Sequence, residues 1–217
     1  MNYQYNLDKD TFLRVKTVNT PRGLYSIKNS KCAAVIWRRQ PVSNFEAWIN
    51  AIMPSNLPRA RIILRPEIVR KAMADLLEAL KLPNCTERDM LIDDIAALAN
   101  IFADIVHATY LRFKLTVIPS GIFTKFHQDQ ASAQLVCTYR GRGMQYEHSI
   151  NGEKPGEIYN VPTGSPIILR GTHWPELPIS NVLHRPPQTH GVSDTMLVLT
   201  LDPVLDLEKQ APHHIMH

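Results

Sequence analysis

Residues 123–130, Phe-Thr-Lys-Phe-His-Gln-Asp-Gln, place a histidine and an aspartate two positions apart, at His127 and Asp129. The pattern around them predicts a β-strand, in which side chains alternate between faces, so these two are expected to project the same way. A second histidine from another strand would complete a two-histidine, one-carboxylate set, which holds iron(II) and leaves coordination positions open. The candidate is His184, in Val182-Leu-His-Arg-Pro-Pro.

The triplet His-x-Asp is evidence for a metal site only because of its place in the chain. With nine histidines, such a triplet arises by chance about 0.5 times in a sequence of this length. From Leu111 onward the hydrophobic period changes to two, and Gly and Pro turns separate short apolar runs, which is typical of a β-sandwich or barrel. The predicted strands cover residues 111–118, 122–129, 132–139, 144–149, 157–161, 166–170, 180–185 and 195–201.

The preceding part of the chain predicts helices. Ser43 and Glu46 form a capping-box pattern for a helix that ends before Pro54, and residues 59–65 read as a strand. Pro66 suits the first turn of a second helix, and Thr86 is a plausible N-cap of a longer third helix. Apolar residues recur along one face of that third helix: Leu91, Ile95, Leu98, Phe102, Ile105 and Tyr110.

Composition indicates a globular protein. The chain has 217 residues, 44% of them hydrophobic and 20% charged, with a net charge of +4. Its three cysteines are scattered, which argues against a disulfide framework or a structural zinc site. The basic residues are scattered too, so nucleic acid is not an expected partner. No stretch resembles a membrane span or a secretory signal, and we expect a cytoplasmic protein without membrane contact.

The predicted elements suggest an α+β architecture. Residues 1–30 read as an irregular segment, and residues 31–217 as a single domain. Within that domain, residues 31–110 form a mainly helical layer, residues 111–203 form the β-unit, and residues 204–217 form a tail. The helices are expected to pack on the outside of the β-unit, because their apolar stripes need a surface to cover.

The order His-x-Asp near the second strand, a distal histidine near the seventh, and a final strand resembles the double-stranded β-helix, a cupin-like jelly roll, of the iron(II)/2-oxoglutarate-dependent oxygenases. The chain also resembles the bacterial family called domain of unknown function 1826, from about Ala33 to Asp202. The phrases that carry this resemblance are Phe126-His-Gln-Asp129, Leu135-Val-Cys-Thr-Tyr-Arg-Gly141, Ile168-Leu-Arg-Gly171, Leu183-His-Arg-Pro186 and Leu197-Val-Leu-Thr-Leu-Asp202.

The oxygenase resemblance implies a catalytic metal site at His127, Asp129 and His184, with Fe(II) as the metal and 2-oxoglutarate as the co-substrate. Zinc fits the same ligands. The alternative is a cupin-like divalent-metal-binding protein of zinc homeostasis without oxygenase activity. A further alternative is an interaction module in which these histidines are ordinary hydrogen-bonded residues. The substrate, a small molecule or a protein, is not identified, and pairing of edge strands into a homodimer is compatible with the pattern.

A 2-oxo-diacid also needs a cation for its distal carboxylate, because a buried carboxylate without a partner costs several kcal/mol. In the oxygenases this cation usually lies on the last strand, yet Val192–Met196 contains no Arg or Lys. Three arginines that end or follow strands are candidate replacements, with surface or hairpin roles as the alternative: Arg140, Arg170 and Arg185. Lys125 shares the predicted face of His127 and is a further candidate, or a lysine that extends to solvent.

Other polar and aromatic residues of the β-unit are weaker candidates for the site. Gln134 is a candidate for a hydrogen bond in the site or for a surface position, and Trp174 for a wall of the site or a hydrophobic cover. The remaining histidines of the region and the tail are expected in surface or loop roles, with a second metal site as the alternative: His148, His173, His190, His213, His214 and His217.

Overall fold

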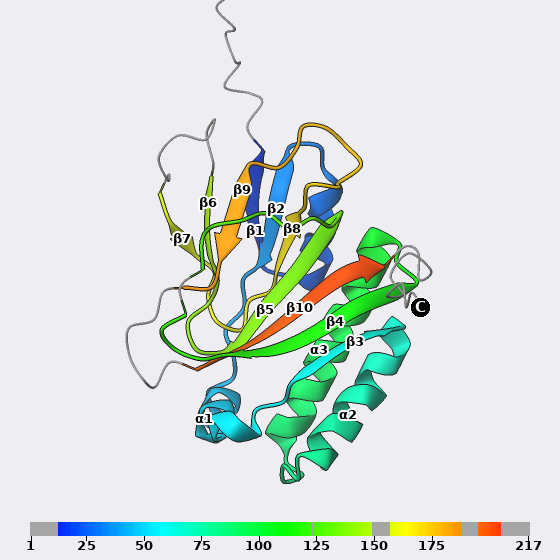
Figure 1. Cartoon of the computed structure of the whole chain (residues 1–217). Coiled ribbons are helices and arrows are strands. Elements are labelled where there is room, and N and C mark those ends of the chain that lie inside the picture. Colours follow the sequence, from blue (N-terminus) through cyan, green and yellow to red (C-terminus); the bar gives the residue numbers. More distant parts are fainter. Residues whose placement is uncertain (1–12, 123, 149–156, 188–194, 205–217) are drawn as a thin grey trace, which may run out of the picture.

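The computed structural model describes residues 13–122, 124–148, 157–187 and 195–204 (Figure 1). The helices of this part are α1 (Ser43–Ala51), α2 (Val69–Ala79) and α3 (Thr86–Val106), with 3-10 helices η2 (Pro21–Lys28), η3 (Pro54–Asn56) and η4 (Pro66–Ile68). The strands are β1 (Arg14–Val18), β2 (Cys32–Trp37), β3 (Ala60–Leu64), β4 (Tyr110–Ile118), β5 (Ala133–Arg140), β6 (Gln145–His148), β7 (Tyr159–Asn160), β8 (Ile167–Arg170), β9 (Val182–Arg185) and β10 (Met196–Val204).

Seven strands form a large sheet in the order β1-β2-β8-β5-β10-β4-β3. All its pairs are antiparallel except β1 with β2. Helices α2 and α3 lie along one face of this sheet (Figure 1), and that face supplies the main core. On β4, Leu111, Phe113 and Leu115 join this core, so the residues between them point to the opposite face.

The small sheet, in the order β7-β6-β9, lies over the opposite face of the large sheet. A second hydrophobic cluster, which includes Val136 of β5, Val182 of β9 and Val198 of β10, packs between the two sheets. From β4 onward the chain moves back and forth between the sheets. This places β9 of the small sheet opposite β5 and β10 of the large sheet.

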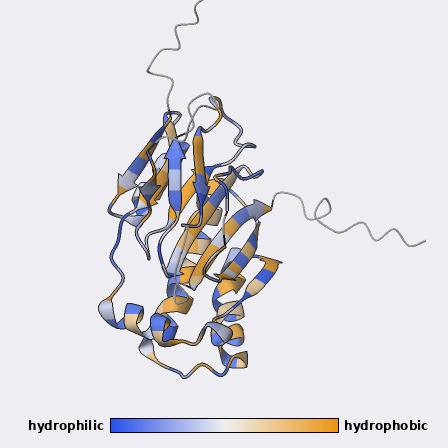
Figure 2. Cartoon of the chain, turned by 60° about the vertical axis from the view of Figure 1, so that its left-hand side comes forward, coloured by the Kyte–Doolittle hydropathy of each residue, from blue (hydrophilic) through white to orange (hydrophobic). Residues whose placement is uncertain are grey.

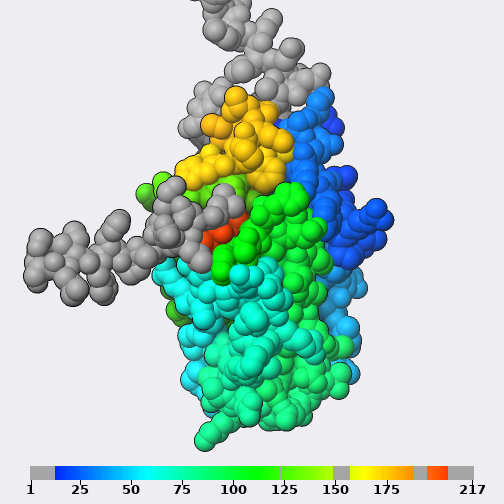
Figure 3. Space-filling view, turned by 90° about the vertical axis from the view of Figure 1, so that its right-hand side faces the viewer, coloured from blue at the N-terminus to red at the C-terminus, as the bar shows by residue number. Residues whose placement is uncertain are grey.

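Amphipathic patterning explains the arrangement. Figure 2 shows hydrophilic and hydrophobic residues alternating along the strands, as a sheet with different environments on its two faces requires. In α3 the predicted apolar residues Leu91, Ile95 and Phe102 are all fully buried. The helix ends at His107, whose left-handed backbone (φ 52°) closes the last turn. Figure 3 shows α2 and α3 covering the lower part of one face of the molecule.

Several sequence expectations are wrong in detail. The region of residues 1–30 is not irregular throughout, because β1 and η2 lie in it. β1 alternates too weakly in hydrophobicity to be recognised alone, and its pairing with β2 is what makes it a strand. The capping box predicted at Ser43 is not formed: α1 begins at Ser43 itself and has no side-chain cap. Tyr110 opens β4 rather than closing α3.

The predicted strand 122–129 is also incorrect over most of its length. Its described residues make a single bridge, between His127 and His184, and the rest is irregular. The Gln128 amide donates to the backbone carbonyls of Arg170 and Ser180, which takes the place of a regular ladder. No helix in the described residues combines the length and the apolar character needed to cross a membrane.

Candidate metal centre

Three side chains from two distant parts of the chain meet at one end of the small sheet. One ring nitrogen each from His127 and His184 and one carboxylate oxygen of Asp129 lie within 4.8 Å of one another. The Asp129 Oδ2 is 3.2 Å from the His184 Nε2, and the two imidazole centroids are 4.7 Å apart. His184 is buried, Asp129 is partly buried and His127 is exposed, so the cluster is open to solvent on one side.

Backbone contacts hold all three positions. His127 N donates to His184 O (3.1 Å) and His184 N donates to His127 O (2.9 Å), so the two histidines form a directly opposed pair. The carbonyl of Asp129 accepts from the N–H of Thr172 at 3.0 Å. Gly171 lies so close to this segment that an added Cβ would collide with the Ala131 carbonyl oxygen.

The donor set fits a divalent metal ion. The Nδ1 of His127 lies 3.1 Å from the Lys125 carbonyl oxygen. Since a carbonyl only accepts, Nδ1 carries the proton and Nε2 keeps its lone pair for a ligand, as in most metal-binding histidines. The Oδ2 of Asp129 is buried and has no hydrogen-bond donor of proper geometry, although His184 is near. A cation among the three groups would satisfy this buried oxygen.

The electrostatics of Asp129 favour its charged form. Burial of the carboxyl acts to raise its pKa, but the neighbouring His184, His127 and Gln134 outweigh burial and lower the pKa. A carboxylate is the form that binds metal ions, so this environment supports the ligand set.

A polar network lies on the large sheet, on the face that looks towards the small sheet. Gln134 Nε2 donates to Asp202 Oδ1 (2.8 Å), and Lys114 Nζ donates to Asp202 Oδ2 (2.8 Å). The Arg112 guanidinium lies 3.9 Å from the same oxygen. Gln134 lies two residues from Val136 on β5, and Asp202 lies four residues from Val198 on β10. Val136 and Val198 belong to the inter-sheet cluster, so Gln134 and Asp202 point to the same face of the large sheet. Asp202 is only 4% exposed and faces two cations.

Sequence reasoning did not single out Lys114, Arg112 or Asp202. A signal was available in the period of two along β4, which places Arg112 and Lys114 on the face away from the helices. Cross-strand pairing of Arg112 with Asp202, which no local pattern shows, completes the network.

The four predicted cations lie elsewhere. Arg140, at the opposite end of β5 from Gln134, donates to the carbonyls of Ile49 and Ile52. Arg170 is fully buried and donates to the carbonyls of Ile27 and Asn29 in and after η2. Both arginines therefore bind backbone carbonyls, and Arg170 is buried rather than in the surface or hairpin role given as its alternative.

Arg185 lies over the Phe126 ring, with 4.1 Å from its Cζ to the ring centroid, and donates to Gln145. It is next to His184 in a strand, so it points to the other face of the small sheet. Lys125 is exposed and contributes its carbonyl to His127. The Trp174 ring packs against Arg170, whose Cζ lies 4.5 Å from the ring centroid. Trp174 also packs against the main core, as a hydrophobic cover does.

Of the other histidines named above, the two that the structure describes are not part of the cluster. His148 is partly buried on β6, where burial lowers its pKa. His173 is exposed on the loop between β8 and β9. His190, His213, His214 and His217 lie outside the described residues, as do positions 192–194 of the segment that lacks a cation.

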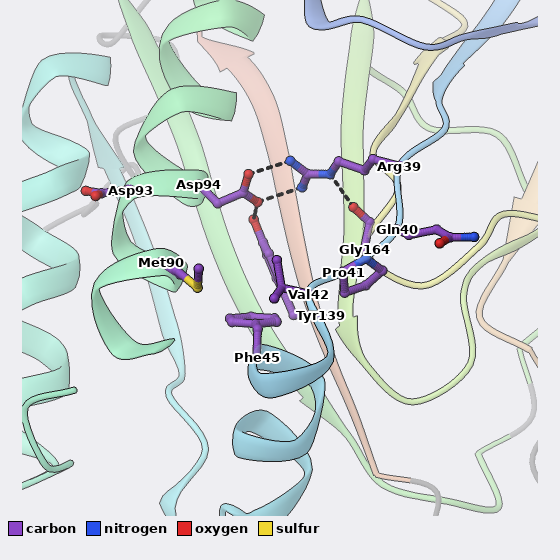
Figure 4. A pocket seen from close by; sticks show the side chains of 10 residues that line it. All are labelled: Arg39, Gln40, Pro41, Val42, Phe45, Met90, Asp93, Asp94, Tyr139 and Gly164. Carbon is purple, nitrogen blue, oxygen red and sulfur yellow. Dashed lines mark hydrogen bonds and ion pairs between the residues drawn. The ribbon is translucent and has the colours of Figure 1, made fainter. Parts of the chain in front are cut away.

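A separate cavity of about 450 Å³ opens between α1, α3 and the end of β5, on the helix side of the large sheet (Figure 4). Asp94 receives a two-pronged ion pair from Arg39 and a hydrogen bond from the Tyr139 hydroxyl (2.6 Å). Arg39 also donates to the Gly164 carbonyl. The polar groups at the base of the cavity are thus paired with one another, and the described residues that line it include no group of three metal ligands.

Comparison with solved structures finds proteins that share the fold of this chain. The dioxygenase for auxin oxidation 1 from Arabidopsis thaliana, solved with 2-oxoglutarate, matches with a TM-score of 0.51 and 9% identity over 89% of this chain and 92% of its own. The dioxygenase for auxin oxidation from rice matches with a TM-score of 0.52 and 9% identity, over 94% of this chain and 88% of its own. At this identity the likeness concerns the fold alone: a mixed α/β structure with a large antiparallel sheet.

Residues 18–202 match the family described as "Protein of unknown function (DUF1826)", and the chain belongs to that family. The sequence resemblance to this family is therefore confirmed. Comparison with curated proteins finds no match.

Proposed function

We propose that this protein is a non-haem iron(II) oxygenase that uses 2-oxoglutarate, with His127, Asp129 and His184 as the metal ligands. The observation that carries the proposal is the geometry of the cluster. Two imidazoles and one carboxylate converge within 4.8 Å. The contact between the Lys125 carbonyl oxygen and the His127 Nδ1 leaves the His127 Nε2 free to bind. Three protein ligands leave the remaining positions of an octahedral ion for substrates.

The fold supports this proposal. The alternation of strands between a large and a small sheet is the arrangement we interpret as a double-stranded β-helix, with N-terminal helices outside it. The cluster lies at the bridge that joins the irregular segment around His127 to β9. The two auxin dioxygenases share the fold, and one was solved with 2-oxoglutarate.

Each ligand has a defined task. His127 and His184 provide neutral imidazole nitrogens, and Asp129 provides the negative charge that offsets part of the charge of a divalent ion. A bound iron(II) supplies activation of dioxygen in the presence of a 2-oxo-acid. The protein's own part is orientation: the paired backbone of the two histidines and the Thr172 contact to the Asp129 carbonyl keep the ligands in place.

For the distal carboxylate of 2-oxoglutarate, the network on β4 replaces the arginines predicted from sequence. Lys114 and Arg112 face one carboxylate, Asp202, so the group of three carries a net positive charge. The side chains of Lys114 and Arg112 are 29% and 27% exposed and thus accessible to a ligand. Gln134 donates to Asp202, and both residues lie on the face of the large sheet that looks towards the small sheet, which supports a role of these cations beside the metal centre.

Anaerobic titration tests the proposal. Metal-free protein is titrated with iron(II) and then with 2-oxoglutarate, while the weak visible charge-transfer band of a chelated 2-oxo-acid is followed. We expect the band only when both are present, and we expect it to disappear in His127→Ala and His184→Ala. His148→Ala, a histidine of the same sheet outside the cluster, is the matched control and should keep the band.

The same titration separates the alternatives. Tight metal binding without the band, with zinc bound as well as iron(II), would reject the oxygenase function in favour of a metal-binding protein of zinc homeostasis. No metal binding by the folded wild-type protein would reject both, and would leave the histidines with a structural role.

A further inference from the structure

Four ring-bearing residues form one continuous row across the small sheet. Tyr159 of β7 pairs with Tyr146 of β6, Tyr146 pairs with His184 of β9, and His184 pairs with His127. Directly opposed residues of antiparallel strands point to the same face. The row therefore runs on one face from the outer edge strand, β7, to the candidate metal ligands. Figure 1 shows β7, β6 and β9 of this sheet.

This face is the one that looks towards the large sheet. Val182, two residues before His184, is in the inter-sheet cluster, and Tyr146 packs against that cluster. The Tyr146 and Tyr159 rings are stacked, with centroids 5.3 Å apart and planes 19° apart. His148 stands edge-on to both rings, at 6.4 Å from each. Tyr159 is 38% exposed, so the outer end of the row is accessible.

We propose that Tyr146 and Tyr159, the tyrosine pair, stack on a planar unsaturated ring of the substrate and hold it beside the metal centre. This inference rests on the proposed function and specifies its substrate class. An aromatic face gains about 0.5–1.5 kcal/mol from stacking on another ring beyond the area that is buried. Because Tyr146 is the direct neighbour of His184, a ring on the pair lies next to the metal ligands.

The polar groups near the pair are a carboxylate that already accepts a hydrogen bond and an imidazole. The carboxylate of Glu157 already accepts a hydrogen bond from the Tyr159 hydroxyl (2.8 Å). Burial lowers the pKa of His148, which keeps this imidazole neutral at neutral pH. Arg185, the neighbour of His184 in β9, points to the other face of the sheet and stacks on Phe126.

The test uses a matched pair of probes with metal-free protein. 2-Naphthol is planar and aromatic, decahydro-2-naphthol is its saturated counterpart, and both are neutral at neutral pH. Their dissociation constants are measured by ligand-observed NMR titration against wild type, Tyr146→Leu, Tyr159→Leu and Tyr146→Phe. Tyr25→Leu, an exposed tyrosine on η2, is the control for the loss of a tyrosine elsewhere. Tetramethylammonium is the cationic probe.

We expect 2-naphthol to bind more tightly than its saturated counterpart, and each leucine variant to weaken this binding about two- to tenfold. Tyr146→Phe and Tyr25→Leu should bind as wild type does. Equal binding of the two naphthols, or leucine variants that bind 2-naphthol as tightly as wild type, would overturn the proposal. Preferential binding of tetramethylammonium that depends on the pair would overturn it too and would assign a cationic substrate.

The metal is absent from this test, so the result does not depend on the proposed ligands. Tyr146→Leu should also retain iron(II) binding and the 2-oxoglutarate band if it folds as wild type does. Equal binding of the two naphthols by wild-type protein that still binds iron(II) would reject the tyrosine pair alone. Loss of metal binding in the wild type would instead reject the proposed function.

Discussion

His127 and His184 are joined by two reciprocal backbone hydrogen bonds, 3.1 Å and 2.9 Å long, and their rings lie 4.7 Å apart. Their imidazoles are thus positioned by paired main chain rather than by side-chain packing alone. The pair exists although the flanking residues of His127 form no regular strand. A single bridge is sufficient to bring the two halves of the candidate metal centre together.

Removal of either histidine is expected to abolish tight metal binding. Loss of an outer hydrogen-bond partner of a metal ligand costs about 10–100-fold in affinity, so loss of the ligand itself should cost at least about 100-fold. The measurement is the iron(II) dissociation constant of His127→Ala and His184→Ala by anaerobic calorimetry. His148→Ala should bind as wild type does, and unchanged affinity in either cluster variant would remove that residue from the ligand set.

Gly171→Ala is expected to weaken metal binding without touching a ligand. Its Cβ would collide with the Ala131 carbonyl oxygen and lie 2.8 Å from the Asp129 carbonyl oxygen, so the segment that carries Asp129 must shift. We expect about a tenfold loss of iron(II) affinity, comparable to the loss of an outer hydrogen bond.

Gly121→Ala is the matched control for this substitution. Gly121 has a positive φ of 81° but an added Cβ there meets nothing within 4 Å. It should cost about 1 kcal/mol of stability from backbone strain and leave metal affinity unchanged. Equal effects of the two substitutions on iron(II) affinity would show that the close approach at Gly171 does not position Asp129.

Lys114→Met is expected to weaken 2-oxoglutarate binding and to preserve iron(II) binding. A charge-assisted hydrogen bond contributes about 1.5–3 kcal/mol, which corresponds to a rise of about 10–100-fold in the dissociation constant. Arg140→Met is the control, because Arg140 contacts the end of α1 and should affect stability only. A 2-oxoglutarate affinity that falls in the Arg140 variant and not in the Lys114 variant would reverse the assignment.

Cys137 is expected to make the protein less stable in alkaline solution. Burial raises the pKa of its thiol to about 12, whereas the thiol of an unfolded chain has a pKa near 8.5. Above that lower value the unfolded chain releases a proton that the folded protein retains. The free energy of unfolding should then fall by up to about 1.4 kcal/mol per pH unit, and no such loss occurs below it.

Urea titrations of wild type and Cys137→Ala at a series of pH values measure this effect. The alanine variant should lose less stability with rising pH, whatever its stability at neutral pH. Parallel curves for the two proteins would mean that the thiol does not titrate between the folded and unfolded states as its burial requires.

The Arg39–Asp94 pair beside the cavity of Figure 4 is expected to stabilise the fold. Both side chains are mostly buried, and Tyr139 also donates to Asp94. Arg39→Met should lower the free energy of unfolding by about 1–3 kcal/mol, because it leaves the carboxylate partly unpaired. Lys71→Met removes an exposed helical pair with Asp75 and should cost less than about 0.5 kcal/mol. Similar losses in urea unfolding would contradict this difference.

The sequence by itself determined the local elements with strong periodicity. The apolar stripe of α3 and the alternation of β4 follow from residue spacing, because a helix or strand must bury one face. The order of His127, Asp129 and His184 along the chain, together with the expected strands and the resemblance to the oxygenases, predicted a cluster. Their convergence in space agrees with that prediction, and their role as ligands is a proposal.

Only the tertiary structure decided which charges meet. Arg140 and Arg170 were candidate cations and Lys114 was not, yet the two arginines bind backbone carbonyls while Lys114 faces Asp202. Likewise, the row from Tyr159 to His127 depends on the register of strands that are distant in sequence. Periodicity tells which face a side chain takes, whereas its partner depends on strand pairing, and pairing is determined by the packing of the whole core.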